Sequence, residues 1–262
     1  SYPKTGFHFS GSCASGIGRP ELLRAVFILL ALLTVHAAAA QEMVSPRVLL
    51  ATVDWPAAAA SLTGQPAGPP AEAFTTLNAA TKSRFPDLGK SSVPVLLPLD
   101  IDALRKEQAG KPDVLVDGFL RGGFHATAFF QAGPAGFDAA FSLRTAEVKE
   151  LSDIRYGEPA YVLFSGLAMV YELAGPPLPD GDPVKSLEDD FPGIRRILHE
   201  SYVRYSFQRY GVIYVAAIYC RDTRPRPKLL TCKQADRIAE RFLRALKLVG
   251  GTPTPARATI EP

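Results

Sequence analysis

Two cysteines are the residues whose placement most clearly predicts chemistry. Cys220 ends an apolar stretch, and Cys232 opens the last amphipathic segment of the chain. A bond between them would close a loop slightly shorter than one of about 15 residues, for which chain entropy gives roughly 3 kcal/mol of stability. The alternatives are a metal pair or a reactive thiol. Zinc requires three or four ligands, and no C-x-x-C or H-x-x-x-H motif accompanies these cysteines. We therefore predict a structural disulfide.

A predicted β-hairpin brings together a second group of polar residues. Residues 124–131 and 137–144 both alternate between apolar and polar side chains, and Ala132–Ala135 lies between them as the turn. We expect Phe130 to pair with Phe137, which fixes the residues that face each other across the two strands.

This register places His125 opposite Ser142, with Asp138 on the same face. A serine, a histidine and an aspartate can perform nucleophilic catalysis. However, Asp138 would lie about four positions along the ladder from His125, and the chain has no G-x-S-x-G elbow. The catalytic residues therefore stay unknown, and we interpret the face as a solvated surface on which His125 and Ser142 are possible ligand contacts.

Basic and aromatic residues alternate in the stretch that follows residue 194. Such mixtures can bind a single-stranded nucleic acid or another anionic polymer. Strand alternation divides the set between two faces, so that only Tyr202 and Arg204 share one with certainty. We add these two residues to the possible ligand surface. The whole set is Arg195, Arg196, Tyr202, Arg204, Tyr205, Phe207, Arg209 and Tyr210.

An acidic segment offers oxygen ligands for a cation, although its spacing is poor. Calcium loops place their carboxylates at set positions with a glycine for the turn, and here Pro183 interrupts the D-x-D start. We interpret the segment as a solvated loop, and we predict neither a metal site nor a cofactor. Its carboxylates belong to Asp180, Asp182, Glu188, Asp189 and Asp190.

The N-terminal residues have the pattern of a secretory signal peptide. Arg19 and Arg24 precede an apolar run from Ala25 to Val35, and Ala38 and Ala40 form an A-x-A cleavage site. The run is shorter than the roughly 20 apolar residues of a transmembrane helix. We therefore expect cleavage after residue 40, a periplasmic or secreted location, and membrane contact only through the signal peptide.

Cleavage changes the charge and the cysteine count of the chain. The full chain has 29 basic and 26 acidic residues, and residues 1–40 carry three of the basic and one of the acidic ones, so the net charge falls from +3 to +1. Two cysteines remain, an even number that favours a disulfide in an exported protein. Near-neutrality argues against a nucleic-acid partner, and 47% apolar residues exclude a disordered polar chain.

The elements that would position these residues follow from periodicity. Residues 233–248 predict the best helix, with Thr231 and Gln234 as a capping box and Gly250 as its C-cap. Residues 212–220 are apolar on both faces and predict a central strand covered on both sides. We expect further strands at 47–55, 93–97, 160–172 (broken near Ser165 and Gly166) and 197–208, helices at 71–85 and 100–108, and loops at 56–70 and 175–193.

Together these elements predict an α+β fold, with a mostly antiparallel sheet packed against a C-terminal amphipathic helix. We expect a leader at 1–40, an N-terminal segment at 41–112, an α+β core with the disulfide at 113–250, and a tail or linker at 251–262. The N-terminal segment either joins the body of the core or forms a small lobe.

The part of the chain from about Val93 to Gly251 resembles regions of exported bacterial proteins that precede LytM-type zinc endopeptidase domains. The likeness rests on FPGIRR at 191–196, YSF at 205–207, YGV at 210–212, the two cysteines, RFL at 241–243 and Gly250-Gly251. A LytM-type site needs an H-x-x-x-D pair and an H-x-H pair around zinc. Here Phe129 and Val203 stand four residues after the two histidines of this part of the chain, and no H-x-H exists. The resemblance therefore implies an accessory region and not the peptidase itself.

Three functions are compatible with this sequence. The first is a non-catalytic exported domain of the cell envelope that binds or positions an envelope polymer or protein, as the accessory region of a peptidoglycan peptidase. The second is a hydrolase whose active site no local motif reveals. The third is a free-standing structural protein.

Overall fold

The computed structural model describes residues 47–63, 70–109, 111, 114–172, 181–221 and 229–253. The predicted leader and all but the first three residues of the predicted tail lie outside this part of the chain. Residues from Pro46 onward belong to one compact unit, which includes the core and all of the predicted N-terminal segment except residues 41–45.

Helices and strands are distributed along the whole described chain. The helices are α2 (Trp55–Thr63), α3 (Pro70–Thr81), α4 (Ile101–Gln108) and α5 (Cys232–Ala245). The strands are β1 (Arg47–Leu50), β2 (Val95–Leu97), β3 (His125–Gly133), β4 (Gly136–Leu143), β5 (Ala160–Leu167), β6 (Met169–Glu172), β7 (Asp182–Pro183), β8 (Arg195–Leu198), β9 (Tyr202–Arg209), β10 (Val212–Tyr219) and β11 (Lys247–Gly250).

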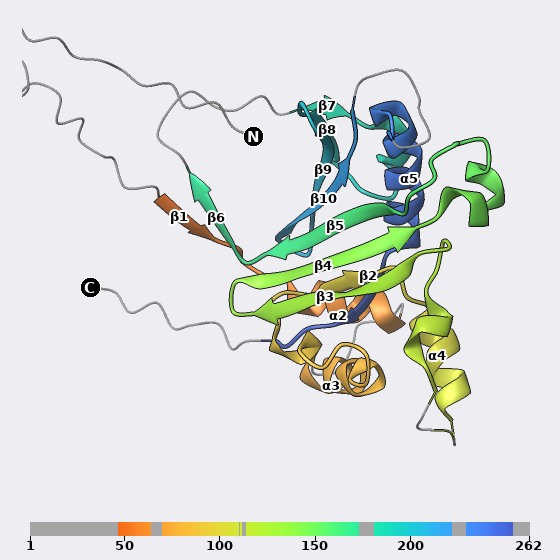
Figure 1. The fold of residues 1–262 in the computed structure, drawn as a ribbon. Helices are drawn as coiled ribbons and strands as arrows, with labels where there is room; N and C mark the ends of the chain where they lie inside the picture. Colours follow the sequence, from red (N-terminus) through yellow and green to blue (C-terminus); the bar gives the residue numbers. More distant parts are fainter. Residues whose placement is uncertain are drawn as a thin grey trace, which may run out of the picture. The chain divides into compact units, whose positions relative to one another are not determined.

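The main sheet has seven strands in the order β3-β4-β5-β10-β9-β8-β7, and all its neighbours are antiparallel. Helix α5 packs against β9 and β10 (Figure 1). The predicted α+β fold with a C-terminal helix on an antiparallel sheet is thus confirmed. Two further two-stranded sheets pair β1 with β6 and β2 with β11.

An aromatic core joins the helix to the sheet. Phe242 of α5 lies with its ring centroid 5.3 Å from Phe164 of β5, 5.5 Å from Phe141 of β4 and 5.1 Å from Phe124. All four side chains are buried. Buried aromatic groups of this size supply much of the apolar area that drives folding, so this cluster fixes α5 on one face of the sheet.

The start of α5 has the predicted capping box. Gln234 donates its backbone N–H to the Thr231 side chain at 3.2 Å, and the Thr231 N–H donates to the Gln234 side chain at 3.0 Å. The predicted end of the helix is wrong. The helix stops at Ala245, and Gly250, predicted as its C-cap, belongs to β11. Leu248 is buried, as it would be on the inner face of either a helix or a strand. Hydrophobic periodicity therefore could not locate the end of the helix and the start of β11.

A disulfide joins Cys220, directly after β10, to Cys232 at the start of α5. The Cα atoms are 4.9 Å apart and both residues are buried. The predicted pairing is confirmed, and the bond connects the helix N-terminus to the central strand.

The β3–β4 hairpin differs from the predicted register near its turn. Phe130 pairs with Ala139 and not with Phe137, because the loop between Gly133 and Gly136 is only two residues long. A bulge between Ala126 and Phe130 then restores the expected pairing of His125 with Ser142. The bulge is stabilised by Thr127, whose hydroxyl donates to the Ala140 carbonyl at 3.0 Å and accepts from the Phe129 N–H at 3.1 Å.

Four other predicted elements change in the structure. The segment 197–208 contains the end of β8, a turn and β9, because apolar alternation continues across the turn. Strand β5 passes unbroken through Gly166, where a side chain would collide with the Phe137 ring, and the break comes at Ala168. The strand predicted at 47–55 ends at Leu50, and residues 55–63, most of which were expected to form a loop, are helix α2. Asp54 accepts from the Ala57 N–H at 2.9 Å at the helix start.

The free edge of β3 is occupied by a side chain from the segment after α3. Arg84 donates from Nη2 to the carbonyls of Ala126 and Thr127 at 3.3 and 2.9 Å, and from Nε to Asp117 at 3.0 Å. Two outward carbonyls of an edge strand are thus satisfied within the chain.

Within the described ranges, no helix combines the length and the apolar character needed to cross a bilayer.

Candidate functional site

The main sheet buries one face and leaves apolar side chains exposed on the other. On β10, Tyr214 and Ile218 are buried, while Ile213 and Tyr219 on the opposite face are 36% and 53% exposed. The prediction that this strand is covered on both sides is therefore wrong, although its central place, between β5 and β9, is as expected. The apolar residues that periodicity assigned to a second buried face belong to a surface.

Tyrosines form a row across three adjacent strands of this open face. Tyr219 of β10 pairs with Tyr202 of β9, and the pairing of Ile218 with Val162 brings Tyr219 beside Tyr161 of β5. Directly paired residues of neighbouring strands have Cβ atoms about 5 Å apart. The three rings therefore form one strip, which we call the tyrosine row (Tyr161, Tyr219, Tyr202).

The surroundings of the tyrosine row combine apolar surface with a few polar groups. Leu163 and Tyr161 are both 53% exposed. Arg221 donates from Nε to the Tyr219 hydroxyl at 3.0 Å. Tyr156 lies near the row, and its pKa is raised above the usual value mainly by burial, with further contributions from nearby Glu158, Tyr219 and Tyr161.

The structure places all four predicted ligand-surface residues on the open face, but in two groups. His125 and Ser142 face each other on β3 and β4, and Tyr202 and Arg204 lie on β9. Three strand spacings separate β4 from β9 in the sheet order, which amounts to about 14 Å. The tyrosine row spans the space between the groups, since Tyr161 pairs with Ser142 and Tyr202 ends the row.

The described residues do not form a Ser-His-Asp arrangement. His125 places Nε2 3.4 Å from the Glu147 carboxylate, and both side chains are more than half exposed. Asp138 pairs with Gln131 near the turn and accepts a hydrogen bond from the Ser165 hydroxyl at 2.5 Å. Asp138, the carboxylate of the predicted arrangement, thus bonds Ser165 and does not join His125, whose ring contacts Glu147 instead.

The Tyr202 end of the row contains polar atoms whose hydrogen bonding is incomplete. The His199 ring stacks on Tyr202 with centroids 4.3 Å apart. His199 Nε2 and Arg204 Nε are both shielded from solvent and have no hydrogen-bond partner in the described part of the chain. Buried polar groups usually find partners, so these two atoms are exceptions among the described residues.

The other face of the sheet holds a polar cluster that attaches α5. Arg196 donates from Nε and Nη2 to the Asp236 carboxylate at 2.8 and 3.0 Å, and the Tyr205 hydroxyl donates to Asp236 at 2.6 Å. The hydrogen bond to Asp236 raises the pKa of Arg196. Burial, followed by the Asp236 carboxylate, raises the pKa of Tyr205 well above its usual range. The cluster is structural, because it faces the helix and its members satisfy one another.

Two carboxylates of the acidic segment are engaged in intramolecular contacts. Asp190 pairs with Arg244 at 3.1 Å, and Glu188 accepts from the Gly193 N–H at 2.9 Å. Asp180 lies outside the described residues. Over the ranges that the structure covers, no three histidine, cysteine, aspartate or glutamate residues come together as a metal site.

Comparison of the chain with protein-family models, with curated proteins and with solved structures finds no match. The geometry of the open face is therefore the observation from which a function can be inferred. Tyr202 was predicted as part of a ligand surface, but Tyr161 and Tyr219 were not. The alternation of side chains along β5 and β10 could have placed both tyrosines on one face of the sheet.

Proposed function

We propose that this chain is a non-catalytic exported domain that binds a glycan polymer of the cell envelope through the open face of its main sheet. The observation that carries the proposal is the tyrosine row on the antiparallel sheet, in which Tyr161 and Tyr219 are each 53% exposed and half-buried Tyr202 continues the row. Tyrosine offers a large, rigid contact area with a polar tip at a low cost in conformational entropy.

The chemistry of the surface suits sugars. A pyranose ring has apolar C–H faces and hydroxyl edges, so it can stack on an aromatic ring while its edge forms hydrogen bonds. Arg204 and the hydroxyls of the row supply hydrogen-bonding groups beside the stacking surface. Arg221 adds a second positive charge at Tyr219, which favours a weakly anionic polymer.

Export is supported by two separate features. The disulfide between Cys220 and Cys232 is typical of an oxidising compartment, and residues 1–40 have the pattern of a signal peptide. We propose a periplasmic or secreted location, with a role in positioning a peptidoglycan peptidase, in keeping with the resemblance of residues 93–251 to regions that precede LytM-type domains.

The test is co-sedimentation of the purified chain with isolated peptidoglycan sacculi. We expect the wild-type protein to pellet with sacculi in a saturable manner, and the double variant Tyr161→Ala/Tyr219→Ala to bind at least about tenfold more weakly. The matched control is Tyr171→Ala, which removes a tyrosine that is 59% exposed on β6, away from the main sheet. This control should bind as the wild type does.

The same sacculi test the absence of catalysis. We expect no soluble muropeptides after incubation with the chain alone, with or without added zinc. Muropeptide release would overturn the non-catalytic role. Failure to pellet, or equal weakening by Tyr171→Ala, would overturn the glycan-binding surface.

A further inference from the structure

A polar cavity lies away from the open face of the main sheet. It has a volume of about 490 Å³ and lies between the start of α4, the end of α5 and the turn that follows β9. Small-molecule sites are usually of this size, with a few charged or polar groups that fix the ligand. Its lining comes from segments far apart in the sequence, so no local motif marks it.

The cavity has more positive than negative groups. Five cationic side chains line it against three carboxylates, and two of the three carboxylates are already engaged. Asp100 accepts from the Ala103 N–H at 3.0 Å as the cap of α4, and Asp190 pairs with Arg244. The cations are Arg105, Arg121, Arg209, Arg244 and Lys247, and the carboxylates are Asp100, Asp102 and Asp190.

Three of these arginines have no carboxylate partner within 4.0 Å in the described part of the chain: Arg105, Arg121 and Arg209. They are half-buried. Arg105 Nε is shielded from solvent and has no hydrogen-bond partner there. The guanidinium groups of the three arginines line the cavity without a carboxylate partner, and an anionic ligand there would supply one.

Arg209, the third of these arginines, comes directly before the turn between β9 and β10. Tyr210 has φ of +53°, in the left-handed region where bulky residues are rare. Its hydroxyl donates to the Ser61 hydroxyl at 2.7 Å, and the Arg209 guanidinium lies 5.2 Å from the centre of its ring. Tyr210 and Gly211 form the two-residue loop of the β9–β10 hairpin, and a positive φ at both loop residues is the usual geometry of such a turn. The turn places Arg209 and Tyr210 together in the wall of the cavity.

We propose that this cavity binds a tetrahedral oxyanion, as a phosphoryl or sulfate group of a small molecule, through Arg105, Arg121 and Arg209. Planar guanidinium groups form paired hydrogen bonds to such oxyanions. The site is independent of the tyrosine row, and its loss would leave binding to sacculi unchanged.

The test is a thermal-shift titration of the full chain with inorganic phosphate, sulfate and acetate, each against sodium chloride at equal ionic strength. We expect saturable stabilisation by phosphate or sulfate and little by acetate. Phosphorus-31 NMR of free phosphate should show saturable line broadening with the wild-type protein. A lack of saturation in both measurements overturns the site, and equal stabilisation by acetate overturns the oxyanion class.

Variants on one helix provide matched controls. Arg105→Gln should weaken the apparent affinity for the oxyanion at least about tenfold. Arg105→Lys keeps the charge but not the planar fork, and should weaken it by less. Lys106→Gln removes the same charge from the exposed neighbouring residue, which does not line the cavity, and should bind as the wild type does. If Lys106→Gln weakens binding as much as Arg105→Gln, the effect is one of net charge and the site is overturned.

Discussion

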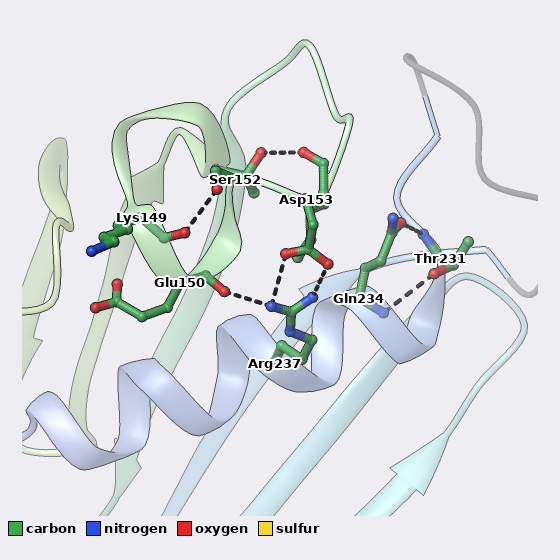
Figure 2. Close-up of polar contacts among 9 residues, drawn as sticks. Lys149, Glu150, Ser152, Asp153, Thr231, Gln234 and Arg237 are labelled. Carbon is green, nitrogen blue, oxygen red and sulfur yellow. Dashed lines mark hydrogen bonds and ion pairs between the residues drawn. The ribbon is translucent and has the colours of Figure 1, made fainter.

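At the scale of single residues, Arg237 and Asp153 show how an exposed ion pair can fix a turn. Arg237 of α5 donates to both carboxylate oxygens of Asp153, at 2.6 and 2.9 Å, and also to the backbone carbonyl of Glu150 (Figure 2). One guanidinium thereby holds the turn at residues 149–153 against the helix. The hydrogen bond to Arg237 lowers the pKa of the Asp153 carboxyl below its ordinary value of 3.8.

This lowered pKa predicts a pH-dependent contribution to stability. The carboxylate stabilises the folded state fully above pH 3.8, the value for the unfolded chain, and this stabilisation is lost as the pH falls through the lower folded-state pKa. We expect Asp153→Asn to melt below the wild type at pH 7, by a small margin because the pair is exposed, and the difference to disappear in strong acid.

Thermal unfolding of both proteins from pH 7 down to pH 2 measures this difference. Asp189→Asn is the control, since Asp189 is exposed and has no hydrogen bond to the described residues. A difference for Asp153→Asn that persists or grows in acid would contradict the assignment.

The sequence could predict some residues of the two sites but not their grouping. Alternation placed Tyr202 and Arg204 on one face, and the structure agrees. Arg105, Arg121 and Arg209 come from three different segments. Their proximity depends on tertiary packing, which no spacing along one chain reports.

At the scale of elements, the disulfide anchors the helix that covers the sheet. Cys220 and Cys232 are 12 residues apart in the sequence, and the intervening loop leads from β10 to the capping box of α5. Closing a loop of this length stabilises the folded state by about 3 kcal/mol in the chain-entropy model.

Reduction should therefore lower the melting temperature of the wild-type protein by roughly 5–10 °C. The double variant Cys220→Ser/Cys232→Ser should melt near the reduced wild type and should not respond to reductant. Mass spectrometry after alkylation should find no free thiol at either cysteine before reduction. Two alkylatable cysteines in the protein purified without reductant would contradict the bond.

Elements were predictable where local chemistry and tertiary packing agree. The start of α5 was predicted from Thr231 and Gln234 because a capping box is local. Strand β11 was missed because it pairs with distant β2, and β10 was misjudged because exposed apolar residues look buried in a sequence. The exposed residues that caused this second error belong to the surface that we propose for binding.

At the scale of the whole molecule, the N-terminal segment and the C-terminal strand are interlocked. Strand β2 pairs with β11, and Tyr214 of the main sheet donates to the Pro94 carbonyl at 2.7 Å. Asn78, the single asparagine of the chain, donates to the Gly251 carbonyl at 2.9 Å and accepts from the Gly251 N–H at 3.1 Å. These contacts link residues more than 100 positions apart.

We therefore expect the chain from Pro46 onward to unfold in one cooperative transition, with no separate melting of residues 47–112. Asn78→Ala should leave both Gly251 groups without partners, cost about 1–3 kcal/mol, and lower the whole transition by roughly 5 °C. Calorimetry tests this, with Thr75→Ala as the control on the exposed side of α3. Two resolved transitions would show that the N-terminal segment is a separate lobe.

The contact that Arg84 makes with the edge of β3 bears on how the protein behaves when it is concentrated. An edge strand with free carbonyls is a template on which another chain can add a strand. Arg84 occupies the carbonyls of Ala126 and Thr127, and the bulge at Thr127 interrupts the regular ladder beside them. Arg84 and the bulge thus leave this part of the β3 edge with fewer free groups on which the strand of a second molecule could add.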